Sequence, residues 1–315
     1  MNNALKITAF ATALAATFGT AYGVGKGVDP LVAAEDRPAQ QHGGHAGGEE
    51  GGAKAAAADH APGGLQISEG GYTLDLETPV VRAGDRGEIR FAVKDDSGRK
   101  VTAYQREHGK ELHFILASTD LTQYRHLHPV RAADGTWSTP VDLPEAGGYR
   151  VFADFTPAAA GAENLTLGAD LAVSGAYRPA ALPAPVATAE VDGYRVALGG
   201  DLRAGRSGEL KLTVSRNGRP VTDLQPYLGA YGHLVALRSG DLAYLHVHPN
   251  EGGPGPMVSF TATAPSAGTY RLFLDFKHEG EVRTAAFTVR VAEAGNGGDG
   301  HQGSGTGAPA AGHAH

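Results

Sequence analysis

Six histidines of the sequence form two trios with the same spacing, His-x12-His-x-His-Pro: His113, His126 and His128, then His233, His246 and His248. The chain has no cysteine and only two methionines, so histidine is its one abundant ligand for a transition metal. Three neutral imidazoles that converge on one point would form an open site for Cu²⁺ or Zn²⁺. The sequence therefore predicts one three-histidine metal site for each trio. Because only the neutral ring coordinates, we expect protonation near the ordinary imidazole pKa of about 6.5 to weaken binding.

Each trio is expected on two adjacent antiparallel strands joined by a turn. Residues 239–240 (Ser-Gly) suit a two-residue turn, which would place His233 opposite His246. His248 would join them because residues two apart on a strand share a face. Directly opposed side chains lie about 5 Å apart at their Cβ atoms, close enough for imidazoles to meet one ion. In the first trio the turn at residues 119–120 (Thr-Asp) is less diagnostic.

Four further residues accompany the trios at equivalent positions: Tyr124, Tyr244, Asp154 and Asp275. The tyrosines precede each His-x-His by two residues and share its face, either as hydrogen-bond partners of the ligands or as packing aromatics. Each aspartate lies inside an apolar strand, where it could orient a ligand imidazole, supply a fourth ligand, or lie on a strand face that is simply wet. His108 and His278 have no matching partners and are expected at the surface.

The sequence contains the same unit twice. Residues 82–84 (RAG) recur as residues 203–205, and residues 146–155 (AGGYRVFADF) recur as residues 267–276 (AGTYRLFLDF). Copies of about 100 residues are longer than solenoid repeats and are typical of duplicated globular domains.

Each copy has the pattern of a β-protein. Residues 88–93 and 209–214 alternate polar and apolar side chains, and turn signals follow at residues 95–98 and 216–218. About seven such segments recur in each copy without an amphipathic helix, and the Ala-Gly-x-Tyr element resembles the tyrosine corner of immunoglobulin-like domains. The sequence therefore predicts an all-β fold of two tandem immunoglobulin-like β-sandwich domains.

Segments of different character surround these domains. The uncharged residues 7–25 predict an N-terminal hydrophobic helix, either a retained membrane anchor or a cleaved signal. Either alternative places the domains outside the cytoplasmic membrane, in a single-pass protein of the cell membrane or in a secreted one. The predicted order is anchor or signal (1–28), disordered His/Gly-rich linker (29–64), first sandwich (65–176), proline-rich linker (177–187), second sandwich (188–293) and disordered His/Gly-rich tail (294–315). The linker and tail histidines either capture metal loosely or are incidental.

Composition leaves three function classes open. The net charge of −7 and the lack of a basic run exclude nucleic acid as a partner. The leading prediction is a divalent-metal binding protein for buffering, resistance or delivery. Two equivalent trios fit a protein that binds several metal ions better than they fit one specialised active site. The alternatives are a metalloenzyme whose open three-histidine sites activate water or cycle copper, and a structural surface protein with incidental histidines. No signature such as His-Glu-x-x-His supports the enzyme.

With these motifs the chain resembles exported bacterial metal-handling proteins of the copper type, which carry immunoglobulin-like or cupredoxin-like sandwich domains. It departs from their common His/Met pattern, since Tyr-x-His-x-His-Pro has no thioether, and it lacks the Cys-His-Met set of blue-copper proteins. The resemblance implies Cu²⁺ or Zn²⁺ binding outside the cytoplasm, with the metal ion and another metal-handling protein as partners.

Overall fold

The computed structural model describes residues 61–245 and 247–294. The predicted N-terminal helix, most of the predicted linker, nearly all of the predicted tail, and His246 lie outside these residues. Among the described residues, no helix is long and apolar enough to cross a membrane.

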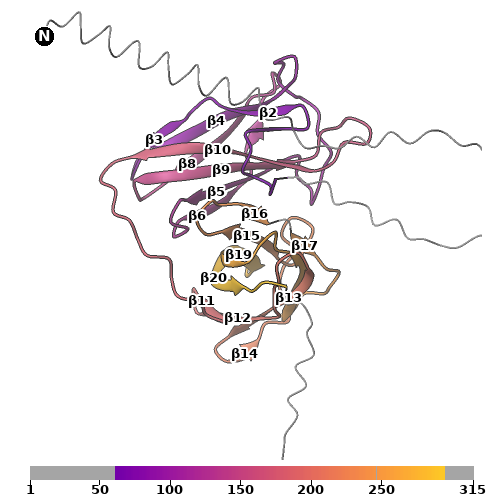
Figure 1. The fold of residues 1–315 in the computed structure, drawn as a ribbon. Helices are drawn as coiled ribbons and strands as arrows, with labels where there is room; N and C mark the ends of the chain where they lie inside the picture. The colour runs from indigo at the N-terminus through magenta and orange to yellow at the C-terminus, as the bar shows by residue number, and fades with distance from the viewer. Residues whose placement is uncertain (1–60, 246, 295–315) are drawn as a thin grey trace, which may run out of the picture. The chain divides into compact units, whose positions relative to one another are not determined.

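The first sandwich is built from two five-stranded sheets (Figure 1). Its strands are β1 (Ser68–Glu69), β2 (Tyr72–Leu76), β3 (Val80–Arg82), β4 (Arg86–Asp95), β5 (His113–Ser118), β6 (Tyr124–Leu127), β7 (Val130–Arg131), β8 (Trp137–Asp142), β9 (Gly147–Phe155) and β10 (Leu165–Ser174). One sheet has the order β1-β2-β4-β8-β7 and the other β3-β10-β9-β5-β6. All neighbours are antiparallel except β3, which runs parallel to β10. This is the strand arrangement of immunoglobulin domains, in which the second, fifth and fourth strands face the third, sixth and seventh.

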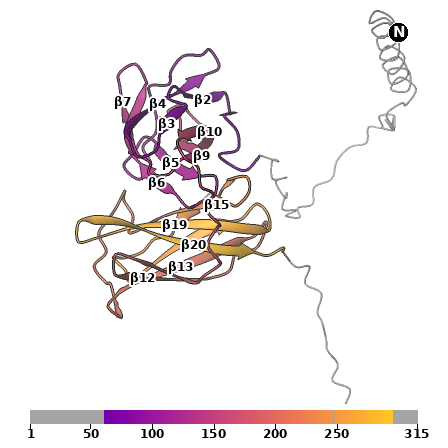
Figure 2. The same cartoon turned by 90° about the vertical axis from the view of Figure 1, so that its left-hand side faces the viewer.

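The second sandwich repeats this arrangement, with β19 and β20 layered over β12 and β13 (Figure 2). Its strands are β11 (Thr188–Val191), β12 (Tyr194–Gly199), β13 (Ser207–Arg216), β14 (Arg219–Pro220), β15 (His233–Arg238), β16 (Tyr244–Leu245), β17 (Val247–Pro249), β18 (Met257–Thr263), β19 (Gly268–His278) and β20 (Glu281–Val291). The sheets have the orders β11-β12-β13-β18-β17 and β16-β15-β19-β20, and β14 pairs with β13. The predicted all-β fold of two immunoglobulin-like sandwiches is confirmed.

Local sequence explains several of these elements. The tyrosine corner forms in both copies, because the Tyr149 hydroxyl donates to the Glu145 carbonyl at 2.8 Å and the Tyr270 hydroxyl donates to the Ser266 carbonyl at 2.9 Å. In the hairpin between β13 and β14, residues 217–218 (Asn-Gly) both have positive φ, of 51° and 73°. Asn-Gly is the preferred pair for such a two-residue turn, since its twist matches that of the strands.

Each sandwich has its own core. In the first, Phe91 of β4 stacks on Phe114 of β5 with ring centroids 4.4 Å apart, so the contact joins the two sheets. In the second, Tyr194 of β12 meets Phe276 of β19 at 5.5 Å. Burying one such ring stabilises the fold by roughly 1.5–3 kcal/mol.

A third apolar cluster, hereafter the interface cluster, draws on both sandwiches, which belong to one compact unit of the chain. Its buried members are Ile115, Ala117, Leu121, Tyr124, Phe152, Val235, Leu237, Leu242 and Phe273. It lies on the outer faces of β5 and β9 and of β15 and β19. Those strands are therefore buried on both faces, which explains why residues 114–117 and 272–274 are apolar at consecutive positions instead of alternating.

Candidate metal centre

The first trio comes from neighbouring strands of one sheet. His113 begins β5, His126 lies in β6, and His128 follows β6 directly. The observed register pairs Ile115 with His126, and the equivalent register of the second sandwich pairs Ala236 with Leu245. The predicted register, with His233 opposite His246, would have paired Ala236 with Ala243.

The predicted register of His233 opposite His246 is therefore wrong by two residues. The turn contains four residues, not two, because the Arg238 amide donates to the Ala243 carbonyl at 2.9 Å. Leu242 adopts a positive φ of 61° within this turn and is buried in the interface cluster. Its packing offsets the cost of about 1–2 kcal/mol for a left-handed leucine.

The three rings of the first trio converge. One nitrogen from each of His113, His126 and His128 can be chosen so that all three lie within 4.8 Å of one another. Nδ1 of His113 lies 3.2 Å from Nε2 of His126. The ring centroids of His126 and His128 are 4.9 Å apart. This group could hold a metal ion.

Two nitrogens of the trio are buried without a hydrogen bond. They are Nε2 of His113 and Nε2 of His128, and neither finds a partner among the described residues. A buried polar atom without a partner costs about 1–3 kcal/mol, and such atoms are uncommon in folded proteins. An ion held by these rings would give such a nitrogen a partner, so the donor set fits a metal that takes imidazole nitrogen.

Asp275 of the second sandwich contacts His126 of the first. Its Oδ2 lies 2.9 Å from Nδ1 of His126 and accepts a hydrogen bond of 3.3 Å from the Tyr124 hydroxyl. Its Oδ1 accepts one of 2.6 Å from the Thr284 hydroxyl. The side chain is 2% exposed, so of the three predicted alternatives the wet strand face is wrong. The carboxylate holds the Nδ1–H tautomer of His126, which leaves Nε2 with a lone pair toward the trio.

The equivalent residue in the first sandwich, Asp154, has different surroundings. Its Oδ1 accepts a hydrogen bond of 3.4 Å from the Thr166 hydroxyl, and Asp154 is paired in register with His113. Both predicted tyrosines pack against a phenylalanine of the other sandwich: Tyr124 stacks on Phe273 at 4.1 Å, and Tyr244 lies 5.6 Å from Phe152.

His233 lies beside the first trio. Its ring centroid is 5.9 Å from that of His113 and 6.0 Å from that of His126. Its Nε2 lies 3.0 Å from the Tyr227 carbonyl oxygen, which leaves Nδ1 as the unprotonated nitrogen. His246 and the side chain of His248 lie outside the described part of the chain, so a second three-histidine site stays a prediction.

Burial keeps these imidazoles neutral. Desolvation, followed by the neighbouring histidines, lowers the pKa of His113 to about 3. The same causes lower the pKa of His128 and that of His233 to about 4 each. Desolvation also raises the pKa of the Tyr227 phenol to about 12. His113, His128 and His233 are therefore neutral at physiological pH, the form in which imidazole binds metal.

Sequence reasoning missed two neighbours of the site, Tyr227 and His108, and misplaced one further residue, His278. Tyr227 lies 5.9 Å from the His128 ring, and the exposed His108 lies 5.3 Å from His233. His278 is buried and not at the surface as predicted, because its ring nitrogens bond the Tyr194 hydroxyl at 2.6 Å and Asp223 at 3.0 Å. The turn glycines 109 and 229, equivalent in the two copies, were the available signal for the loops that carry His108 and Tyr227.

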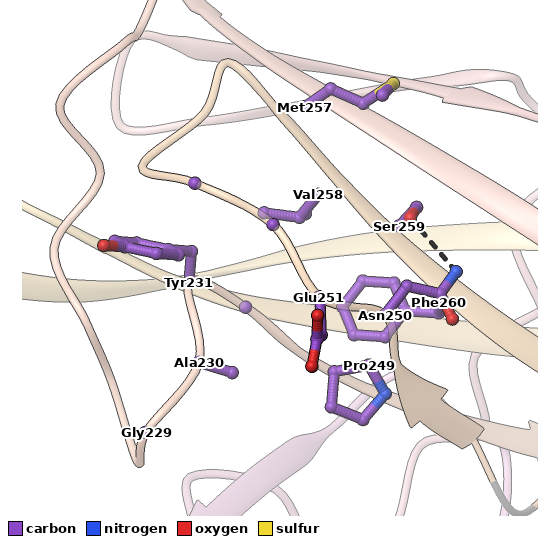
Figure 3. A pocket seen from close by; sticks show the side chains of 13 residues that line it. Gly229, Ala230, Tyr231, Pro249, Asn250, Glu251, Met257, Val258, Ser259 and Phe260 are labelled. Atoms are coloured by element: carbon purple, nitrogen blue, oxygen red, sulfur yellow. Dashed lines mark hydrogen bonds between the residues drawn. The ribbon is translucent and has the colours of Figure 1, made fainter.

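Two cavities lie near these residues. One of about 250 Å³ borders the trio and is lined by residues of both sandwiches, including His113, Asp154 and His233. Another, of about 630 Å³, lies on the second sandwich around Tyr231 and Met257 (Figure 3). Glu251 is the only charged group among the residues that line it, so the larger cavity carries no constellation for chemistry.

Fold and site together define a protein of two tandem immunoglobulin-like sandwiches with a candidate histidine metal centre. The family model described as "Domain of unknown function (DUF8832)" matches residues 66–167 and 189–293, one match in each sandwich. The chain belongs to this family. The family description names no activity, so it gives no support to the expected likeness to copper-handling proteins.

No curated protein sequence matches the chain. Among solved structures, FdeC, an adhesin of Escherichia coli, is 18% identical with a TM-score of 0.23, and the match covers 71% of this chain and 65% of that one. Invasin, a bacterial integrin-binding protein, is 15% identical with a TM-score of 0.22, over 72% of this chain and 41% of that one. A DUF4426 family protein of Pseudomonas aeruginosa PAO1 is 10% identical with a TM-score of 0.26, over 33% and 93%. Likenesses at this level say nothing about what this chain binds.

Proposed function

We propose that the protein binds a divalent transition metal ion, Cu²⁺ or Zn²⁺, through His113, His126 and His128. The observation that carries this proposal is the pair of buried, unpartnered Nε2 atoms of His113 and His128. They lie in a group whose third ring is oriented by a carboxylate. A histidine that bonds a carboxylate through one nitrogen and offers the other to an ion is the usual arrangement in protein metal sites.

The ligand set selects the class of metal. Neutral imidazoles suit zinc, copper and nickel, whereas calcium and magnesium require oxygen ligands. The chain has no cysteine, which removes thiolate sites for Cu(I). The role we propose is buffering, resistance or delivery of the ion outside the cytoplasmic membrane. The N-terminal segment would anchor the chain to the membrane or direct its secretion, and another metal-handling protein would receive the ion.

The test is a calorimetric titration of a shortened chain, residues 61–293, with Zn²⁺ and with Cu²⁺. Starting at residue 61 removes His42, His45 and His60 but keeps Gly63 and Gly64, which bond to the folded region. We expect one equivalent at the trio, lost when His113, His126 and His128 are all changed to alanine. The matched control is His278→Ala, which removes a buried imidazole outside the trio and should bind as the parent does. A second equivalent, lost on substitution of His246 and His248, would establish the second predicted site. A parent that binds neither ion would leave a structural sandwich protein.

The cavity beside the trio favours a second candidate, a metalloenzyme. Its volume of about 250 Å³ would admit a small molecule next to the ion, and Asp154 lines the same space. A bound metal would lower the pKa of a water molecule or polarise a substrate oxygen. Assays for hydratase, oxidase and dismutase turnover on the metal-loaded chain distinguish this candidate, because a buffering protein shows none.

A further inference from the structure

The two sandwiches meet through equivalent surfaces. In the interface cluster Ile115 and Val235 occupy the same position in the two copies, as do Ala117 and Leu237. The aromatic contacts are likewise reciprocal, since each sandwich places a tyrosine on a phenylalanine of the other. This cluster is separate from the two sandwich cores, so it holds the sandwiches together and contributes little to the interior of either one.

The same interface completes the trio. All three histidines of the trio belong to the first sandwich, but the carboxylate that fixes the ring of His126 is Asp275 of the second. This carboxylate is 2% exposed and is satisfied by hydrogen bonds to both sandwiches. If the sandwiches separated, His126 would lose its orienting partner and Asp275 would be exposed to water.

The second sandwich also encloses the trio. The ring of His233 faces His113 and His126, and its Nε2 is tied to the Tyr227 carbonyl. The ring of Tyr227 lies 6.3 Å from that of His126 and 5.9 Å from that of His128. These side chains help to exclude water from the trio, and one of them, His233, brings a fourth imidazole to its edge.

We propose that the metal centre is composite, so that metal binding at the trio and docking of the second sandwich stabilise each other. This inference rests on the proposed metal binding at the trio. Asp275 is the positioning residue that couples the two events, and His233, its register partner on β15, covers the edge of the trio beside it. By linkage, a substitution that weakens docking weakens metal affinity, and bound metal strengthens docking by the same factor.

The test uses the full chain with two variants and one control. Asp275→Asn removes the carboxylate and keeps its shape. Leu237→Glu places a charge in the interface cluster and leaves all histidines intact. Val282→Glu places the same charge on an exposed position of the second sandwich and is the matched control. Because the outer-shell partner of a metal ligand typically contributes about 10- to 100-fold in affinity, we expect both variants to bind Zn²⁺ about 10- to 100-fold more weakly than the control.

Docking itself is measured by spin labels. The natural chain has no cysteine, so one cysteine in place of Val130 and one in place of Met257, both exposed, give a single labelled pair across the two sandwiches. We expect a narrow distance distribution in the parent, a broad one in metal-free Leu237→Glu, and a narrower one when Zn²⁺ is added to that variant. In the Zn²⁺ titrations of the full chain, binding by the N- and C-terminal histidines is measured on the variant in which His113, His126 and His128 are changed to alanine. That contribution is then subtracted.

The outcomes separate the two proposals. A parent that binds no Zn²⁺ at the trio overturns both. A parent that binds, with Asp275→Asn and Leu237→Glu binding equally well, leaves the proposed function standing and overturns the composite centre. The composite centre is also overturned if Zn²⁺ leaves the distance distribution of Leu237→Glu unchanged. If Leu237→Glu fails to fold, as judged by circular dichroism, the affinity of Asp275→Asn decides.

Discussion

Lowering the pH from about 7.5 to about 5.5 is expected to weaken metal binding at the trio about 100-fold less than it would weaken binding by three solvated imidazoles. Burial and the neighbouring rings lower the pKa of His113 to about 3 and that of His128 to about 4. Both rings therefore stay neutral in the folded chain throughout this range, and protons do not compete with the metal for them.

The magnitude follows from the ordinary pKa of histidine. A solvated imidazole with a pKa of about 6.5 is neutral in about one molecule in eleven at a pH of about 5.5. Three such rings would lose about 1000-fold in metal affinity by proton competition. Removing His113 and His128 from this competition removes about 100-fold of that loss. The pH dependence that the sequence predicts is thus replaced by a much weaker one.

The assay is a Zn²⁺ titration of residues 61–293 at pH values of about 7.5, 6.5 and 5.5. A peptide of residues 295–315 serves as the solvated reference, because it carries three histidines of the same protein in water. Over this range the affinity of the peptide should fall steeply, and that of the shortened chain should fall much less. Equal losses in the two would refute the reasoning, since they would mean that the trio is as open to protons as a free peptide.

Three further predictions concern stability. Without metal, the free energy of unfolding should fall as pH decreases from about 6.5 toward about 4, by up to about 1.4 kcal/mol per pH unit for each of His113, His128 and His233, because these rings bind protons there in the unfolded chain and not in the folded one; urea unfolding at several pH values measures this slope, which the trio-to-alanine variant should reduce. Tyr149→Phe and Tyr270→Phe each remove the hydrogen bond of a tyrosine corner and should cost about 1 kcal/mol by the same assay; no change in either variant would show that the ring alone holds the corner. Removal of residues 61–64 takes away the backbone hydrogen bonds of Gly63 and Gly64 and should lower the melting temperature relative to a chain that starts at residue 61, a difference that calorimetry can detect or exclude.

The fold was largely predictable because its signals are local. Alternation over residues 88–93 and 209–214 predicts strands that the structure places within β4 and β13. The repeated Ala-Gly-x-Tyr element predicts the tyrosine corners at Tyr149 and Tyr270. A strand pattern and a turn residue depend on neighbours in sequence, so one chain suffices to recognise them.

The site was only partly predictable because half of its surroundings come from the other copy. The sequence identifies His113, His126 and His128 as a set by their spacing, and it identifies Asp275 as an acid that needs a partner. It cannot connect Asp275 to His126, which is 149 residues away. Spacing within one copy suggested two independent sites, whereas the packing of one sandwich on the other places His233 next to the first trio.

Signals for that packing were present in the sequence. Residues 114–117 are apolar at every position, which indicates a strand covered on both faces. Residues 88–93 of the same copy instead alternate polar and apolar side chains, as a strand with one solvent-exposed face does. The turn of the second trio was misassigned because Leu242 takes a positive φ that leucine avoids in isolation. That conformation depends on its burial in the interface cluster, which no local rule anticipates.

The most direct test of the central claim is X-ray absorption spectroscopy of residues 61–293 loaded with one equivalent of Zn²⁺. Metal binding by His113, His126 and His128 predicts back-scattering from several imidazole rings, and this signal should be lost when the three histidines are changed to alanine. A spectrum without imidazole scattering, or one that the triple substitution leaves unchanged, would contradict the claim that this trio is a metal centre.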